Sequence, residues 1–100
     1  MNAIIKDHLS EIHQLCLSHH VTKLYAFGSV VSGEFKESSD VDFLVSFDNM
    51  DPEDYADNYF QLAGQLEHVL NRPVDLVTEN SLGNQYFIRS VNRSKLQIYG

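Results

Sequence analysis

The chain has 100 residues, of which 43% are hydrophobic and 21% are charged. This length predicts a single domain over residues 1–100 with one modest hydrophobic core, and the composition excludes a disordered or low-complexity chain. The formal net charge of −7 argues against a general nucleic-acid-binding protein, because phosphate backbones repel an acidic surface.

The first third of the chain predicts a helix, a strand and a short second helix. Over residues 4–16, apolar side chains recur at spacings of three and four, which is typical of one helix that ends near residues 19–20. Lys23–Phe27 is short, apolar and partly aromatic, and predicts a buried strand. Gly28-Ser29 interrupts this strand, and residues 30–34 are long enough for one or two helical turns.

The middle of the chain predicts a second strand and a longer helix. After a polar loop at residues 36–39, polar and apolar residues alternate from Asp40 onward with the period of two that a strand imposes. Asp51 has the position of a helix N-cap and Pro52 that of the first helical residue. An apolar face at helical spacing follows, and the helix ends before Asn71.

The end of the chain predicts two short strands around a last helix. Residues 74–77 form one strand, residues 84–94 form the helix, and residues 96–99 add an edge strand. The alternating order of helices and strands predicts an α/β (α+β) fold, a small mixed sheet with helices packed on it. The sequence leaves the order of the strands open.

Three aspartates belong to these apolar strand segments. Asp40 and Asp42 are two residues apart, so their carboxylates point to the same side of one strand. Like charges this close need a counter-charge, and Mg²⁺ prefers carboxylate oxygens. Asp75 repeats the pattern, in 'VDLV' after 'VDFLV'. Each aspartate alone would be a solvated acid, but if the two strands are neighbours the three carboxylates predict a site for one or two metal ions.

Gly28 and Ser29 lie between a strand and a predicted helix start, where backbone N–H groups and the helix dipole suit a phosphate. Gly28 lets the backbone approach a ligand closely, and the Ser29 hydroxyl can donate to a phosphate oxygen. Alone, the pair is equally compatible with a turn glycine and a helix N-cap. With the aspartates, it predicts a site for phosphates and their accompanying metal.

The spacing of these residues resembles a known family. Gly28-Ser29, ten residues and then Asp40-Val41-Asp42, with Asp75 as a third carboxylate, is similar to the signature of the DNA polymerase β-like nucleotidyltransferases. The stretches 'SDVDFLV' and 'RPVDLVTENSL' and the ending 'IYG' look like the minimal nucleotidyltransferase (MNT) group. One departure is Val30-Val31-Ser32, where many relatives carry a basic residue.

The resemblance implies metal-dependent nucleotidyl transfer. Asp40, Asp42 and Asp75 would hold one or two Mg²⁺ ions, Asp75 would help activate an attacking hydroxyl, and Gly28 and Ser29 would bind the phosphates of ATP, the donor. Some MNT proteins are antitoxins that adenylylate HEPN ribonuclease toxins, typically at tyrosine. By this resemblance the chain is a type VII-like antitoxin that transfers AMP to a HEPN-type toxin and forms a hetero-oligomer with it.

Two other functions stay open at this point. The chain could be a non-catalytic antitoxin or nucleotide-binding module that neutralises a partner by binding, with the site kept for folding or nucleotide sensing. Transfer to a small molecule or an RNA end is disfavoured by the length of the chain and by its negative charge.

The histidines near the single cysteine imitate a metal cluster, but their helical spacing favours a buried Cys16 with surface histidines at positions 13, 19 and 20. One cysteine excludes an internal disulfide and favours a reducing cytoplasm. No apolar run approaches the roughly 20 residues of a membrane span, and the N-terminus is polar too early for a secretory signal. We therefore expect a cytoplasmic protein.

The remaining candidates have simpler interpretations. Arg89 and Arg93, with Lys95 just beyond, are more consistent with a solvated helix face than with a contact to the triphosphate or to an acidic partner. Tyr55 and Tyr59 are more consistent with the core than with a site.

Overall fold

The structure is a computed structural model that describes residues 1–33, 36, 39–79, 83 and 85–100. Its elements, in chain order, are α1 (Ala3–Lys6), α2 (Leu9–Ser18), β1 (Val21–Phe27), α3 (Ser29–Ser32), β2 (Val41–Phe47), α4 (Pro52–Leu70), β3 (Val74–Thr78), α5 (Gln85–Ser94) and β4 (Leu96–Tyr99). Within these residues, no helix is both long enough and apolar enough to cross a membrane.

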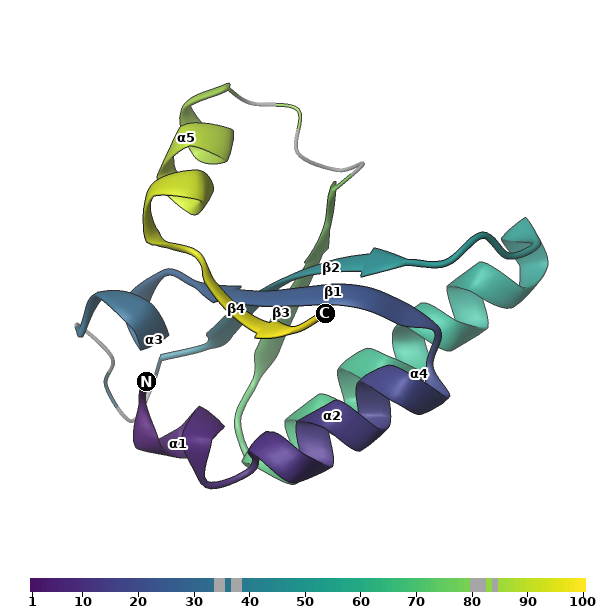
Figure 1. Ribbon diagram of the computed structural model, residues 1–100, viewed down its shortest axis with the longest axis horizontal. Helices are drawn as coiled ribbons and strands as arrows, with labels where there is room; N and C mark the ends of the chain where they lie inside the picture. Colours follow the sequence, from purple (N-terminus) through teal and green to yellow (C-terminus); the bar gives the residue numbers. More distant parts are fainter. Residues whose placement is uncertain (34–35, 37–38, 80–82, 84) are drawn as a thin grey trace.

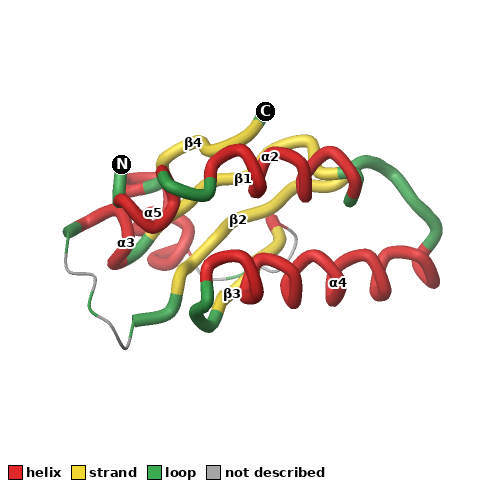
Figure 2. The backbone as a smooth tube through the Cα atoms, turned by 90° about the horizontal axis from the view of Figure 1, so that it is seen from below, coloured by secondary structure: helices red, strands yellow, loops and turns green. Residues whose placement is uncertain are grey.

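The strands form one mixed sheet in the order β3-β2-β1-β4. β1 is antiparallel to both β2 and β4, whereas β2 and β3 are parallel. In Figure 1, α1, α2 and α4 lie below the sheet and α5 lies above it. Figure 2, seen from below, shows α2 and α4 side by side in front of the sheet. The predicted mixed sheet with packed helices is confirmed, and the strand order is now known.

Apolar side chains fill the two faces of the sheet unequally. The main core lies between the sheet and α1, α2 and α4. Its largest fully buried side chains are Phe43, Ile5, Ile12, Leu24, Leu62 and Leu66. On the other face, Phe27, Leu44 and Val91 form a smaller cluster that holds α5 to the sheet. One face is therefore fully covered, while the face of α5 is covered only in part.

The alternation of side chains along the strands places the acids on the face of α5. Val41 and Phe43 belong to the main core, so Asp42, between them, points to the opposite face. Asp75 follows the same rule on β3, because Leu76 next to it belongs to the main core.

Two predicted boundaries were wrong near the N-terminus. The first apolar segment is two helices, because the chain leaves helical geometry at His8, which has φ −117° and ψ 16°. Asp7 and His8 have low helix propensity, and Ile5 and Ile12 are buried on either side of this break. β1 begins two residues earlier than expected, because Val21 is itself buried and pairs with β2.

The long helix α4 begins and ends as predicted. Pro52 is its first residue and Asp51 its N-cap, although the Asp51 side chain makes no capping hydrogen bond. Asn71 ends the helix in a left-handed conformation, with φ 53°. The last helix and the edge strand are also confirmed, while Glu34, Asn84 and part of the loop at residues 36–39 lie outside the described residues.

The three histidines near Cys16 are not all on the surface. Cys16 is buried, as predicted. His19 was expected on the surface but is only 7% exposed, and its Nδ1 lies 2.8 Å from the Leu15 carbonyl oxygen. His13 is half-buried, and its Nε2 lies 2.7 Å from the Ile98 carbonyl oxygen, which links α2 to β4. Of the three histidines near Cys16, His20 is the exposed one, so the surface prediction was wrong for His19.

Candidate active site

Gly28 lies where β1 ends and α3 begins, directly beside Asp42. Phe27, the residue before Gly28, is the Cα partner of Asp42 in the pairing of β1 with β2. Gly28 has φ 73° and ψ −147°, a conformation that residues with a side chain rarely adopt. A Cβ atom at this position would collide with the Asp42 carboxylate. The backbone conformation therefore favours glycine, and a side chain at this position would also force the Asp42 carboxylate to move.

β3 brings Asp75 to the other side of Asp42. The two residues are Cα partners in the parallel pairing of β2 with β3, so the neighbouring strands on which the predicted convergence depended are present. Asp40 is two residues away along the chain, but β2 starts only at Val41, so the prediction that Asp40 lies on the strand was wrong. Asp40 and Asp75 are exposed, and Asp42 is half-buried.

The charges of the three aspartates act on one another. Burial of its carboxyl, followed by the negative charges of Asp75 and Asp40, raises the pKa of Asp42 from 3.8 to about 6. On the face of the sheet that carries α4, the pKa of Tyr59 is raised as well. Burial of its hydroxyl is the largest cause, followed by the charges of Asp75 and Tyr55. The region around Asp42 is therefore a focus of negative potential that a cation would relieve.

The chemistry of these side chains suits a hard divalent cation such as Mg²⁺, which prefers carboxylate oxygens. The positions of the three carboxylates, in contrast, do not form a finished metal site. Across residues 1–33, 36, 39–79, 83 and 85–100, no group of three His, Cys, Asp or Glu side chains is gathered as a metal ion would need. The carboxylates thus fit the ion in donor type and charge, and binding would require their side chains to draw together.

Ser29 is the first residue of α3, a single helical turn that follows the strand without a loop. The Gly28 carbonyl oxygen accepts hydrogen bonds from the Val31 and Ser32 N–H groups, each at 3.0 Å, so the helix begins at once. The first N–H groups of a helix have no partner within the helix and point toward its start. Ser29 is half-exposed at this point and directly follows Gly28, the residue that lies next to Asp42. Its role in phosphate binding remains a prediction.

A wide surface depression lies away from these residues. It has a volume of about 570 Å³ at the start of α4, and its lining includes His20, Asp51, Asp54 and Asp57. An acidic lining repels a nucleotide, because the phosphates carry the same charge. The size of this depression therefore does not identify it as the site.

Tyr59 is a core residue, as predicted, that also supports the site. Its hydroxyl donates a hydrogen bond to the Leu76 carbonyl oxygen and so ties α4 to β3 one residue after Asp75. No sequence pattern indicates this contact, because it depends on the packing of a helix against a strand.

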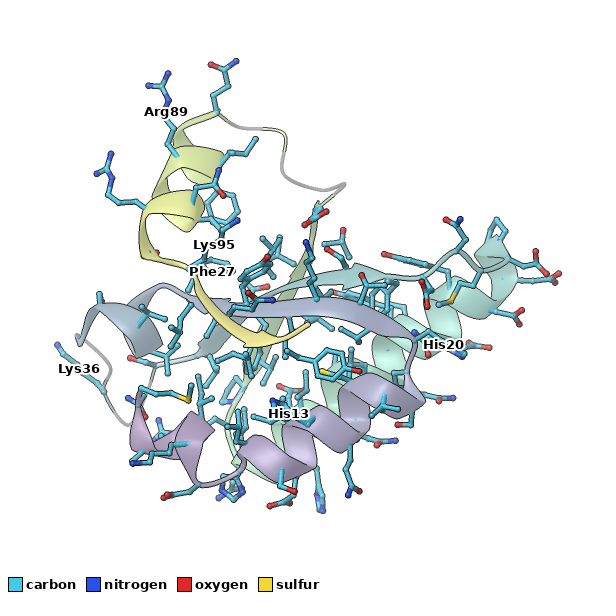
Figure 3. The ribbon with its side chains drawn as sticks, in the orientation of Figure 1. His13, His20, Phe27, Lys36, Arg89 and Lys95 are labelled. Atoms are coloured by element: carbon cyan, nitrogen blue, oxygen red, sulfur yellow. The ribbon has the colours of Figure 1, made fainter. Side chains whose placement is uncertain are left out.

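The basic side chains of α5 are solvated, in agreement with the simpler interpretation. Arg89 and Arg93 are exposed, and Figure 3 shows Arg89 pointing away from the sheet. The Lys95 ammonium lies 4.6 Å from the centre of the Tyr25 ring, on the face of the sheet that carries α5. No salt bridge between these cations and the aspartates occurs among the described residues.

Sequence reasoning missed Phe87 altogether. Its ring meets the ring of Phe27 edge to face, with 5.9 Å between centroids and 78° between planes. Phe27 is the neighbour of both Gly28 and Asp42, so Phe87 lies at the border of the site. Only the packing of α5 on the sheet reveals the position of Phe87.

Known proteins are similar to this chain in sequence and in fold. The family model of the nucleotidyltransferase domain matches residues 4–98. A provisionally named protein adenylyltransferase of Methanocaldococcus jannaschii, MJ1215, is 38% identical over 79 residues, which covers 79% of this chain and 85% of that protein. Protein adenylyltransferase MntA of Thermococcus cleftensis is 37% identical over 82 residues, which covers 74% of this chain and 80% of that protein.

Two solved structures are similar in fold. A provisionally identified minimal nucleotidyltransferase has a TM-score of 0.78 at 29% identity, and the match covers 96% of this chain and 95% of that one. A crystal structure of a toxin–antitoxin with AMP-PNP has a TM-score of 0.71 at 26% identity, and covers 92% of this chain and 73% of that one. The resemblance noted in the sequence is thereby confirmed, and the chain belongs to the nucleotidyltransferase domain family.

Proposed function

We propose that this chain is a metal-dependent protein adenylyltransferase that transfers AMP from ATP to a tyrosine hydroxyl of a HEPN-type toxin. The observation that carries the proposal is the convergence of Gly28 and Asp75 on Asp42, from three separate elements. Its similarity to protein adenylyltransferases supports a protein as the acceptor. Its similarity to a toxin–antitoxin structure with AMP-PNP supports ATP as the donor and an antitoxin role in a hetero-oligomer.

In this proposal, separate residues bind the triphosphate and the metal ions. The Gly28 backbone and the Ser29 hydroxyl bind the triphosphate, while Asp40, Asp42 and Asp75 hold one or two Mg²⁺ ions. Bound Mg²⁺ would offset the charges of the phosphates and of the carboxylates. Single-domain organisation over residues 1–100 and a cytoplasmic location belong to the same proposal.

In the transfer itself, the hydroxyl oxygen of the acceptor forms a bond to the α-phosphorus of ATP. The bond from that phosphorus to the β-phosphate oxygen breaks, and pyrophosphate leaves with the electron pair. Asp75 accepts the proton of the attacking hydroxyl, since an exposed carboxylate beside Asp42 can reach a group that approaches the open face. The protein contributes position and charge more than covalent chemistry.

Neutralisation of the toxin tests the proposal against an antitoxin that acts by binding alone. The chain is co-expressed with a HEPN-type toxin, as wild type and as the double variant Asp40→Asn, Asp42→Asn. We expect the double variant to lose protection of cell growth while the complex still forms in a pull-down. The matched control, Asp48→Asn with Asp57→Asn, removes two charges from exposed positions away from Gly28 and should protect fully. Full protection by the first double variant would favour neutralisation by binding.

A further inference from the structure

The outer side of α4 combines two features that the packing of the described residues does not explain. Phe60 is 70% exposed in the middle of this helix. Gly64 follows one helical turn later and is exposed on the same side. A glycine inside a helix is less stable than an alanine. Outside the backbone of its own helical turns, no described atom lies within 4 Å of the place that a Cβ of residue 64 would occupy, so packing within the chain does not require this glycine.

The Phe60 ring is held in place by its neighbour. It meets the Tyr59 ring edge to face, with 5.3 Å between centroids and 83° between planes, and the Tyr59 hydroxyl is bonded to the Leu76 carbonyl oxygen. A ring that is already held loses little conformational entropy when a partner covers it. The missing side chain of Gly64 lets a partner come close to the helix backbone. Aromatic anchors of this kind dominate the centres of protein–protein interfaces.

The surroundings of Phe60 and Gly64 are acidic. α4 contains four acidic residues and no lysine or arginine. The wide depression at the start of α4 has an acidic lining, to which Asp51 and Asp54 belong. A cationic side chain of a partner suits this lining, because the two are opposite in charge. Two copies of this chain that met symmetrically through α4 would bring their acids together, so charge favours a different, cationic partner over a second copy.

We propose that the outer side of α4, with Phe60 and Gly64 at its centre, binds the toxin through a toxin surface in which lysine or arginine surrounds an apolar group. This inference rests on the proposed function, which gives the chain a protein partner. In Figure 1, α4 lies on the face of the sheet opposite to α5, and therefore opposite to Asp42 and Asp75. Figure 2 shows α4 along the outside of the molecule. A toxin bound there leaves the candidate active site open to the nucleotide.

The affinity of a HEPN-type toxin for the chain, measured by biolayer interferometry, tests this surface. Phe60→Ala removes the anchor. Gly64→Gln places a neutral side chain in the contact and raises helix propensity, so it should not impair folding. We expect each change to weaken toxin binding at least about 10-fold, as when a central anchor of an interface is lost. Leu17→Ala, which truncates a 72% exposed leucine of α2, is the matched control and should bind as the wild type does.

The same measurement at low and at high salt tests the charge of the partner. The affinity of the wild type should fall as salt rises, because ions screen the acids of α4 from the cations of the toxin. A single charge at the rim of an interface contributes little, so the salt dependence reports on these charges together. An affinity that does not change with salt would overturn the cationic partner surface.

The outcomes separate this inference from the proposed function. The double variant Asp40→Asn, Asp42→Asn should bind the toxin as the wild type does. Wild-type affinity in both Phe60→Ala and Gly64→Gln would overturn the α4 surface, while AMP transfer by the wild-type chain would still support the proposed function. A dimer of the chain alone that Phe60→Ala disrupts in analytical ultracentrifugation would also overturn it, because α4 would then bind a second copy. A wild-type chain that neither binds the toxin nor adds AMP to it would contradict the proposed function, and the α4 surface with it.

Discussion

Replacing Asp42 with asparagine is expected to make the metal-free protein more stable, although the same change should abolish transfer. In the folded protein, burial and the charges of Asp75 and Asp40 raise the pKa of this carboxyl from 3.8 to about 6. A carboxyl whose pKa rises on folding costs stability when it is ionised. The cost is absent below pH 3.8, grows as the pH rises to about 6, and is constant above that.

The size of the effect follows from the shift and from the exposure of the group. The difference between 6 and 3.8 is about 2 pKa units, which corresponds to about 3 kcal/mol of unfolding free energy. The carboxyl is only half-buried, so solvent screening reduces this value. We expect Asp42→Asn to increase the free energy of unfolding by about 1 kcal/mol at pH 7.5, which raises the melting temperature of a domain of this size by about 5 °C.

Thermal unfolding followed by circular dichroism, in EDTA at pH 7.5 and pH 5.0, measures this gain. At pH 5.0 Asp42 is only partly ionised in the folded protein, so its charge costs less stability. Asp42→Asn should therefore increase the unfolding free energy by about half as much as at pH 7.5. The control is Asp57→Asn, which removes one charge from an exposed position of α4 and should gain much less. Equal melting temperatures of the two variants at pH 7.5, or a gain that does not shrink at pH 5.0, would refute the reasoning.

Three further predictions concern the same region. Mg²⁺ should raise the melting temperature of the wild type but hardly that of Asp42→Asn, because the variant lacks a proposed metal ligand. Equal shifts of the two melting temperatures in a Mg²⁺ titration would mean that the ion binds at another place. In urea unfolding, Gly28→Ala should lose about 2 kcal/mol more than Gly33→Ala, because Gly28, with φ 73° and ψ −147°, lies outside the left-handed region that Gly33 occupies, and because a Cβ at Gly28 would displace the Asp42 carboxylate; equal losses would contradict this account. Tyr59→Phe should lower the unfolding free energy by about 1 kcal/mol through its lost hydrogen bond and keep nucleotide affinity, so weakened ATP binding in calorimetry would contradict its supporting role.

Local patterns in the sequence were sufficient for much of the fold. The alternation around Asp42 and Asp75 predicted two strands with their acids on the side away from the core, because a strand turns successive side chains to opposite faces. It was wrong only in placing Asp40 on the first of these strands as well. Pro52 and Asn71 predicted the ends of α4, since their preferred backbone conformations start and stop a helix.

The remaining features depend on contacts between segments that are distant in sequence. The parallel pairing that sets Asp42 beside Asp75 is one, because no local pattern fixes which strands are neighbours. The close approach of the Asp42 carboxylate to Gly28 is another, since the sequence indicates a turn glycine but not what lies next to it. The burial of His19 was missed for the same reason, because helical spacing alone does not show which elements cover a helix end.

Intact-protein mass spectrometry tests the central claim most directly. A HEPN-type toxin is incubated with this chain, Mg²⁺ and each nucleoside triphosphate in turn, with wild type and with the double variant Asp40→Asn, Asp42→Asn. We predict that ATP adds the mass of AMP to the toxin only with the wild-type chain. A toxin that keeps its mass with every nucleotide, while still forming a stable complex with the wild-type chain, would contradict nucleotidyl transfer to this partner.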